Sequence, residues 1–258
     1  MVRRPEPSAP PCWPRHQTER DRTDLRVGIT LPQFRADADE ALAVARRAEA
    51  AGLDGVFVFD HLWPIGQPDR PALHGPSLLA AVATETTRIA VGTLVARVGL
   101  LPDDVLIRGL NTVAAMAGKR LIAGLGIGDR LSRTENRAYG VPFPPAGARR
   151  AALVAVCRRL RALGIETWIG GLSAGTRAVA RSEADAVNLW GVEPSRLAAE
   201  PAGVPVTWGG QVDLATTDVT AHLAALAGAG ATWAVVAPLG AGWPAAVELL
   251  GSAREVLR

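Results

Sequence analysis

The sequence predicts an α/β protein built as a single (β/α)8 barrel. Short apolar runs alternate with helical patterns from Leu25 onward, which is typical of repeated βα units around a parallel sheet. Eight such runs occur with no Pro/Ser-rich linker between them, and this favours a closed barrel over an open sheet. The length of 258 residues is near that of single α/β barrels. We expect residues 25–258 to form one barrel domain.

Residues 1–24 differ from the rest of the chain. They are rich in proline and charge and lack the apolar core of a secretory signal. We expect them to be a disordered extension, or to lie upstream of the true start of translation.

The predicted strands are short and apolar. The second contains four consecutive apolar residues, Val56 to Phe59, which is typical of a strand buried on both faces of a parallel sheet. In chain order the eight strands are expected at residues 25–31, 55–59, 88–94, 120–125, 165–169, 186–189, 204–208 and 232–237.

Helices are predicted between the strands from apolar residues at helical spacing. They include residues 38–51, 103–117, 148–163 and 219–229. Each of these patterns is followed by or ends near a glycine, as expected for a helix C-terminus: Gly52, Gly118, Gly164 and Gly230.

The loops that follow barrel strands carry the active site in barrel enzymes. Asp60 and His61 come directly after the second strand, and Asp129 follows the fourth. One imidazole with two carboxylates is sufficient for general acid-base chemistry, since the ordinary pKa of histidine is near neutrality. Two structural alternatives stay open: Asp60 caps a solvated turn, and Asp129 caps the segment 130–139.

A second candidate site follows the fifth strand. Residues 170–177 contain glycines, two hydroxyls and Arg177, and they open a predicted helix, so that backbone N–H groups and a guanidinium converge. This combination is typical of a phosphate site. The alternative is a turn of small residues in which Ser173 caps the helix.

Tryptophans provide candidate walls for a planar ring. Trp63, Trp190 and Trp208 lie at or near strand ends, whereas Trp168 lies inside a strand and is expected in the core. With Gln33, which follows the first strand, Trp63 and Trp190 are the candidate substrate-pocket residues. His16, His74 and His222 show no ligand spacing, and structural roles are expected for them.

Several function classes are disfavoured. The net charge is only +3 and the arginines are scattered, which gives little support to nucleic-acid binding. No apolar stretch approaches the length of a membrane helix. Two distant cysteines, Cys12 and Cys157, indicate neither disulfides nor a metal site and fit the cytoplasm. P-loop, Gly-x-Ser-x-Gly and HExxH motifs are absent.

The motifs together resemble the bacterial-luciferase-like superfamily, in its branch of coenzyme F420-dependent oxidoreductases. The resemblance runs through nearly the whole predicted barrel, and each motif alone is weak. It rests on residues 50–54 running into 59–61, residues 88–95, residues 124–129 with 135–140, and residues 168–171 with 184–185.

The resemblance implies specific roles. It places a deazaflavin ring over the end of the third strand, with a cis peptide at Leu94-Val95, and the phosphate tail on the loop after the fifth strand. His61 is implied to exchange the substrate proton, with Asp60 orienting it and Asp129 as a second proton-handling group. The implied cofactor contacts are Thr93, Leu94, Val95, Gly128, Ser132, Gly170, Gly171, Ser173, Thr176 and Arg177.

The chain also departs from that branch. Trp63 lies two residues after His61, whereas the sugar-phosphate dehydrogenases of the branch have a tryptophan four residues after, so a different substrate is expected. The insertions before the fifth strand and after the seventh are reduced, and the pocket is expected to be more open.

The leading hypothesis is an oxidoreductase that transfers a hydride between coenzyme F420 and a small organic substrate. One alternative is an FMN-dependent luciferase-like monooxygenase, and another is a non-catalytic protein that binds flavin or F420. The sequence leaves open a homodimer and does not indicate the substrate.

Overall fold

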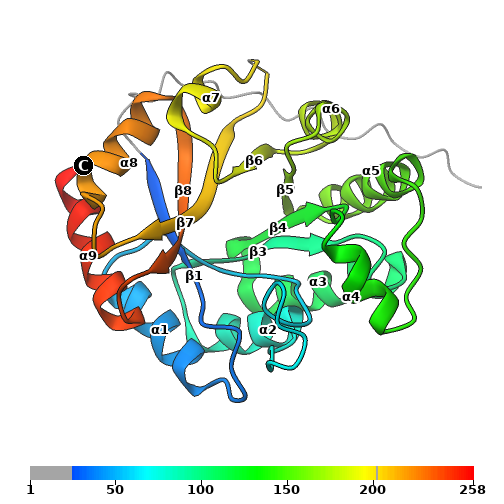
Figure 1. Cartoon of the computed structure of the whole chain (residues 1–258), viewed down its shortest axis with the longest axis horizontal. Coiled ribbons are helices and arrows are strands. Elements are labelled where there is room, and N and C mark those ends of the chain that lie inside the picture. The colour runs from blue at the N-terminus through cyan, green and yellow to red at the C-terminus, as the bar shows by residue number, and fades with distance from the viewer. Residues whose placement is uncertain (1–24, 202) are drawn as a thin grey trace, which may run out of the picture.

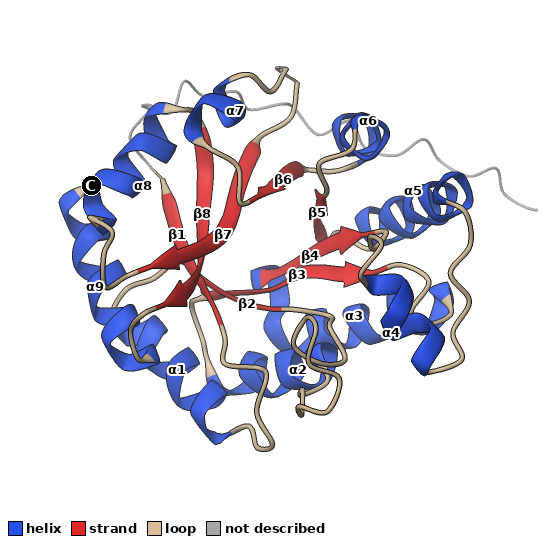
Figure 2. Ribbon diagram, in the orientation of Figure 1, coloured by secondary structure: helices blue, strands red, loops and turns tan. Residues whose placement is uncertain are grey.

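The computed structural model describes residues 25–201 and 203–258. In this part of the chain eight parallel strands close into a barrel in the order β1 to β8, with helices around the outside (Figures 1 and 2). The predicted (β/α)8 barrel is therefore confirmed. The expected disorder of residues 1–24 concerns residues outside the described part.

The strands follow one another around the barrel, and β8 closes it by pairing with β1, from Arg26 opposite Trp233 to Ile29 opposite Val236. Their bounds are β1 Arg26–Thr30, β2 Gly55–Val58, β3 Ala90–Arg97, β4 Leu121–Gly126, β5 Glu166–Gly170, β6 Ala186–Trp190, β7 Val206–Asp213 and β8 Ala231–Leu239.

The helices lie between successive strands and form the outer layer (Figure 2). Their bounds are α1 Asp39–Ala50, α2 Gly75–Glu85, α3 Asp103–Ala117, α4 Ser132–Ala138, α5 Ala146–Ala162, α6 Ala174–Glu183, α7 Pro194–Ala198, α8 Val219–Gly228 and α9 Trp243–Val256, and a 3₁₀ turn, η1, spans Gly118–Arg120. Within the described residues no helix is long and apolar enough to cross a membrane.

Strands β3 and β7 run further than their patterns predicted. The expected third strand stopped at Leu94, but β3 continues to Arg97 past a register shift between Thr93 and Ala96. The expected seventh strand stopped at Trp208, but β7 continues to Asp213 and stays paired with β8. The added residues of β7 are mostly glycine and polar, and those of β3 lie at a register shift and end in the charged Arg97, so neither end continues a regular apolar pattern. The connections from α5 to β5 and from β7 to α8 are short, as expected.

Aromatic rings fill the inside of the barrel. Phe57 lies between Trp168 and Trp233, with ring centroids 5.5 and 5.8 Å away, and the two indoles are 5.4 Å apart. All three are buried, which confirms the core position predicted for Trp168. The rings fit because glycines face them: a Cβ at Gly92 would lie 2.7 Å from Phe57. The barrel is thus a packed core, and space for a ligand is left at its ends.

Replacing Phe57 by Ala removes the ring that contacts both indoles. We expect the free energy of unfolding to fall by about 3–5 kcal/mol, because a buried aromatic ring leaves a cavity that its neighbours cannot close. Denaturant unfolding measures this change. Val256→Ala, at a side chain that is 73% exposed on α9, is the control. A loss for Phe57→Ala no larger than for the control would contradict the packed interior.

Candidate functional site

Three neighbouring strand ends bring the candidate catalytic residues together. Asp60 and His61 follow β2, Arg97 is the last residue of β3, and Glu135 comes from α4, which follows β4. Since the strands are parallel, all these ends lie at the carboxyl end of the barrel, where barrel enzymes carry their sites. This placement agrees with the sequence prediction for Asp60 and His61.

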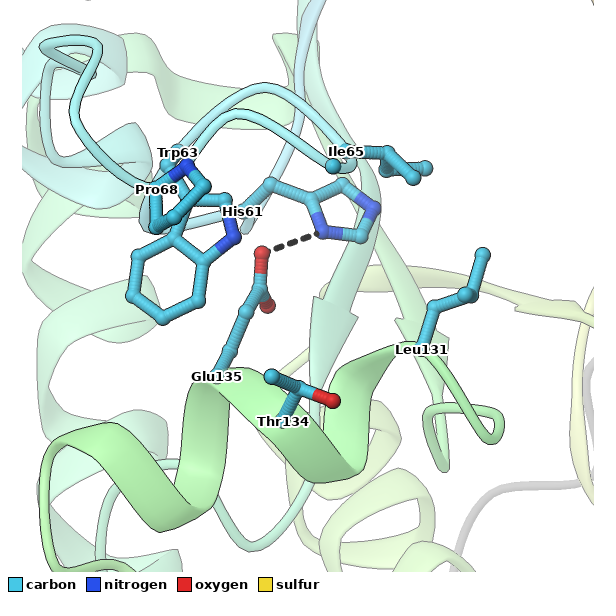
Figure 3. Close-up of a pocket in the computed structure, with 8 residues that line it drawn as sticks. His61, Trp63, Ile65, Pro68, Leu131, Thr134 and Glu135 are labelled. Atoms are coloured by element: carbon cyan, nitrogen blue, oxygen red, sulfur yellow. Dashed lines mark hydrogen bonds and ion pairs between the residues drawn. The ribbon is translucent and has the colours of Figure 1, made fainter.

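Glu135 joins His61 to Arg97. Its Oε1 lies 2.9 Å from Nδ1 of His61, and its Oε2 accepts a hydrogen bond of 2.6 Å from the Arg97 guanidinium. Figure 3 shows the Glu135 carboxylate reaching up from α4 to the imidazole. Sequence analysis used Glu135 only as part of a family motif and missed it as the partner of His61.

The electrostatics of Glu135 fix the proton on one ring nitrogen. Burial raises the pKa of Glu135, but the hydrogen bond and charge of His61, together with the charge of Arg97, outweigh this and lower the pKa below its ordinary value. An ionised carboxylate only accepts hydrogen bonds, so Nδ1 of His61 must donate. With the Nδ1 proton donated to Glu135, any free lone pair of the ring is on Nε2, which is turned away from Glu135 (Figure 3).

The Arg97 side chain is buried and hydrogen-bonds several groups around it. Its guanidinium donates to the Ser132 carbonyl at 3.1 Å, to Asn136 Oδ1 at 3.0 Å and to the Asp60 carbonyl at 3.1 Å, in addition to Glu135. It thereby ties the β2 and β3 ends to α4. The signal for this residue was present in the sequence, since Arg97 is a charge inside an otherwise apolar stretch, but the pattern does not indicate its partners.

No hydrogen bond joins the side chains of Asp60 and His61 among the described residues, and a role for Asp60 in orienting His61 remains a prediction. Asp60 Oδ2 instead accepts the backbone N–H of Arg97 at 2.6 Å, and Glu135 holds the imidazole. Burial raises the pKa of Asp60 to about 6, although the hydrogen bond and the charge of Arg97 partly oppose this. Adjacent residues in sequence point to different partners here because successive side chains leave an extended segment in opposite directions.

Asp129 holds the start of α4. Its Oδ1 accepts from the backbone N–H groups of Leu131 at 2.9 Å and Ser132 at 3.0 Å, and from the Ser132 hydroxyl at 3.1 Å. Burial raises the pKa of Asp129, but these hydrogen bonds outweigh it and lower the pKa. This is the capping alternative that the sequence left open. The structure shows no hydrogen bond from Asp129 to His61 in the described chain, and a proton-handling role remains a prediction.

The end of β3 has the form expected for a ring site. The peptide bond Leu94-Val95 is cis, as the resemblance implied. Val95 and Trp190 are half-buried at the barrel mouth, and both pack against the aromatic interior of the barrel. Val95 lies close to the backbone of β4 and β5, because a Cβ at Gly126 or Gly170 would lie 2.5 or 2.8 Å from its methyl groups. The end of β3 thus presents an apolar surface, formed by Val95 and Trp190, at the mouth of the barrel.

Three of the residues implied to contact the cofactor are held by interactions within the protein. Thr93 is buried and its hydroxyl donates to the Gly124 carbonyl at 2.7 Å. Ser132 is buried against Asp129. Gly128, at a φ of 67°, makes the turn between β4 and α4. These residues form part of the frame of the site, and their contacts with a cofactor remain predictions.

The predicted phosphate loop folds as a capped helix start. Ser173 accepts from the Thr176 backbone N–H at 3.2 Å and donates to the Thr176 hydroxyl at 2.9 Å. Arg177 points elsewhere and pairs with the buried Glu200. A different arginine lies at the helix start: a Cβ on Gly175 would be 3.3 Å from Nε of Arg150. With the N–H groups that begin α6, Arg150 supplies the positive charge that a phosphate needs.

The three candidate substrate-pocket residues lie in different parts of the structure. Gln33 is buried, its amide donating to the Phe59 and Leu73 carbonyls at 2.9 and 2.8 Å and accepting from Phe59 N–H at 2.7 Å. It is therefore a structural tie between β1 and the segment after β2, and a substrate contact of Gln33 remains a prediction. Trp190 lies edge-on to Phe59 at the barrel mouth. Trp63 stacks on Tyr139 and lines a cleft beside His61.

That cleft has a volume of about 150 Å³ and lies between the segment after β2 and the start of α4 (Figure 3). It is lined by His61, Trp63, Ile65, Gly66, Pro68, Leu131, Thr134 and Glu135. Over residues 25–201 and 203–258 no group of three or more His, Cys, Asp or Glu side chains is placed to hold a metal ion.

The fold is that of a (β/α)8 barrel protein, and the candidate site lies at the carboxyl end of the strands. Residues 16–205 match the family model of luciferase-like monooxygenases. The chain belongs to this family.

Among curated proteins, the chain is similar to F420-dependent glucose-6-phosphate dehydrogenases. It is 33% identical over 140 residues to the one from Intrasporangium calvum, covering 53% of this chain and 42% of that protein. It is 35% identical over 123 residues to the one from Kineococcus radiotolerans, covering 46% and 35%. The chain thus spans less than half of the length of these relatives.

Solved structures share the fold. An F420-dependent secondary alcohol dehydrogenase in complex with an F420-acetone adduct superposes with a TM-score of 0.79 at 13% identity, covering 91% of this chain and 99% of that one. Coenzyme F420-dependent tetrahydromethanopterin reductase from Methanopyrus kandleri gives 0.69 at 14% identity, covering 88% and 97%.

The buried carboxyl of Asp60 makes stability depend on pH. Because its pKa is raised from 3.8 to about 6, ionising it costs the folded state about 3 kcal/mol more than the unfolded state. This penalty is absent below pH 4 and is fully present above pH 6. We expect the unfolding free energy of Asp60→Asn, relative to wild type, to increase by up to that amount between pH 4 and pH 7.

Denaturant unfolding at a series of pH values measures this difference. Asp69→Asn, at an exposed carboxylate, is the matched control and should show no such trend. An Asp60→Asn difference that is flat with pH would show that Asp60 titrates normally in the folded protein.

Proposed function

We propose that the protein is an oxidoreductase that transfers a hydride between coenzyme F420 and a small organic substrate, with His61 as the acid-base group. The observation that carries the proposal is the hydrogen bond between Glu135 and Nδ1 of His61, 2.9 Å long. It leaves Nε2 basic and directed away from Glu135, in a half-exposed side chain at the mouth of the barrel. An imidazole held by an ionised carboxylate is a common form of general base.

The residues present fit the cofactor. When bound, F420 supplies a deazaflavin ring that accepts or returns a hydride. Val95 and Trp190 would pack against this ring at the barrel mouth. Gly170, Gly171, Ser173 and the start of α6 would hold the phosphate, and Arg150 would neutralise its charge.

His61 would handle the proton of the reaction. In the oxidation of an alcohol, the carbon loses a hydride with both electrons of the C–H bond, and the cofactor is reduced. The hydroxyl proton passes to Nε2 of His61, and a carbonyl forms. Glu135 stabilises the resulting imidazolium, because it lies 2.9 Å from Nδ1 and is itself ionised.

The comparisons support this class of reaction. The relatives that the chain matches are F420-dependent dehydrogenases, and solved structures with the same fold include F420-dependent enzymes. The description of the family model favours a second candidate, an FMN-dependent monooxygenase. A protein that binds such a cofactor without catalysis is the third. The cofactor that the protein binds distinguishes the first two candidates from each other. The presence of turnover distinguishes both of them from the third.

Titration of the purified protein with F420 and with FMN tests which cofactor it binds more tightly. We expect F420 to bind at least about tenfold more tightly than FMN, a difference of about 1.4 kcal/mol. Quenching of the tryptophan fluorescence provides a readout, since Trp190 lies at the proposed ring site. Tighter binding of FMN would reject the F420 proposal in favour of the monooxygenase.

Replacing His61 by Ala tests the role of the imidazole. We expect turnover with F420 to fall by about 10²- to 10⁴-fold, the usual contribution of a general base, while F420 affinity stays unchanged. His74→Ala is the matched control, because His74 is exposed and its side chain bonds only Ser77 among the described residues. Turnover retained in His61→Ala would assign the proton transfer to another group.

A further inference from the structure

The cleft beside His61 is walled by apolar side chains. Trp63, Ile65 and Pro68 come from the segment between β2 and α2, and Leu131 comes from the opposite side, next to α4 (Figure 3). Ile65 and Leu131 are 55% and 48% exposed, which is unusual for large apolar side chains that face a cleft. Exposed apolar surface in a concave site is typical of a place where an apolar ligand binds.

The lining of the cleft has no free positive charge. No Lys or Arg is among its described lining residues. Of the arginines in adjoining segments, Arg70 donates to Gln67 and Arg133 lies over the Phe143 ring. Arg130, which precedes Leu131, is exposed and does not line the cleft. Arg97 is buried, and its guanidinium is used by Glu135, Asn136 and two carbonyls.

The charge that does face the cleft is negative. Glu135 is one of the lining residues, and its pKa is lowered, so it is ionised at neutral pH. A phosphate monoester placed here would lose part of its water shell, meet no arginine or lysine among the lining residues and lie near this carboxylate. Burial of an unpaired charge is strongly unfavourable. The cleft therefore selects against an anionic substrate.

The size of the cleft limits the substrate as well. A cavity of about 150 Å³ lined by apolar side chains is known to bind benzene, which has six heavy atoms. The cleft beside His61 has a similar volume but is open on one side, so a ring that carries one additional group fits.

We propose that the substrate is an uncharged, mainly apolar alcohol or ketone of about six to ten heavy atoms, such as a cyclic secondary alcohol, and not a sugar phosphate. The inference rests on the proposed function. The hydroxyl lies at Nε2 of His61, and the hydrocarbon lies between Ile65 and Leu131. In the oxidation, the C–H hydride reduces F420, the hydroxyl proton goes to Nε2, and the alcohol becomes a ketone.

The test uses cyclohexanol, glucose and glucose 6-phosphate as probes. Binding to the protein without added cofactor is measured by saturation-transfer NMR, and turnover of the F420-loaded protein is measured from the loss of oxidised F420. We expect saturation transfer to cyclohexanol only, and a kcat/KM for cyclohexanol at least about 100-fold above that for glucose 6-phosphate.

Two variants locate the binding site. Leu131→Arg and Ile65→Arg place a guanidinium at the rim of the cleft, at exposed positions that tolerate substitution. Each should reduce kcat/KM for cyclohexanol by about tenfold or more and remove the NMR signal. Leu249→Arg is the matched control on α9, at a leucine that is 43% exposed and does not line the cleft, and it should change kcat/KM by no more than about twofold.

The outcomes separate this inference from the proposed function. Turnover of glucose 6-phosphate above that of cyclohexanol, or a cyclohexanol signal that both rim variants retain, overturns the substrate class and leaves F420-dependent hydride transfer in place. Cyclohexanol binding that the rim variants abolish, without reduction of bound F420 by any of the three probes, supports an apolar cleft and overturns hydride transfer from this substrate class.

Discussion

The ion pair between Arg97 and Glu135 is the interaction on which the site depends. Glu135 can hold the proton of His61 on Nδ1 only while it stays ionised, and the charge of Arg97 helps to keep it so in a buried place. The same guanidinium bonds the Asp60 carbonyl and the Ser132 carbonyl. One side chain therefore sets the charge of the site and fixes the relative positions of the β2 end and α4. Buried pairs of this kind are costly to break from one side.

The fold could be predicted from the sequence because its signals are local and repeated. Each buried strand is an apolar run, and each parallel crossover needs a helix, so eight runs define the barrel. Strand ends were predicted less well, as β3 and β7 show, because the residues that extend them, such as Arg97 and Gln211, do not carry an apolar pattern. Gln33 illustrates a related point: a polar residue at a strand end suggests a ligand contact, and its hydrogen bonds to the Phe59 and Leu73 carbonyls have no signal in the sequence.

The site was only partly predictable. His61 and Asp60 were found because they interrupt an apolar strand, and the carboxyl end of a parallel strand is a usual place for function. Glu135 lies 74 residues after His61, and no short-range pattern joins them. The same is true of Arg150, which reaches the start of α6 from the preceding helix. Charged residues on helices are normally solvated, so sequence spacing does not distinguish those that turn inward.

The cleft has a mixed origin, and this has an evolutionary consequence. One wall of the cleft is formed by Trp63, Ile65 and Pro68, which all belong to a single surface segment between β2 and α2. The residues that hold His61 in place come from elsewhere, Glu135 from α4 and Arg97 from the end of β3. Point changes or insertions in that one segment can reshape the wall without disturbing Arg97 or Glu135. Selection is therefore free to diversify the molecules that such a barrel accepts while the proposed proton chemistry is inherited unchanged. This modular arrangement can be exploited in the laboratory by loop exchange between relatives.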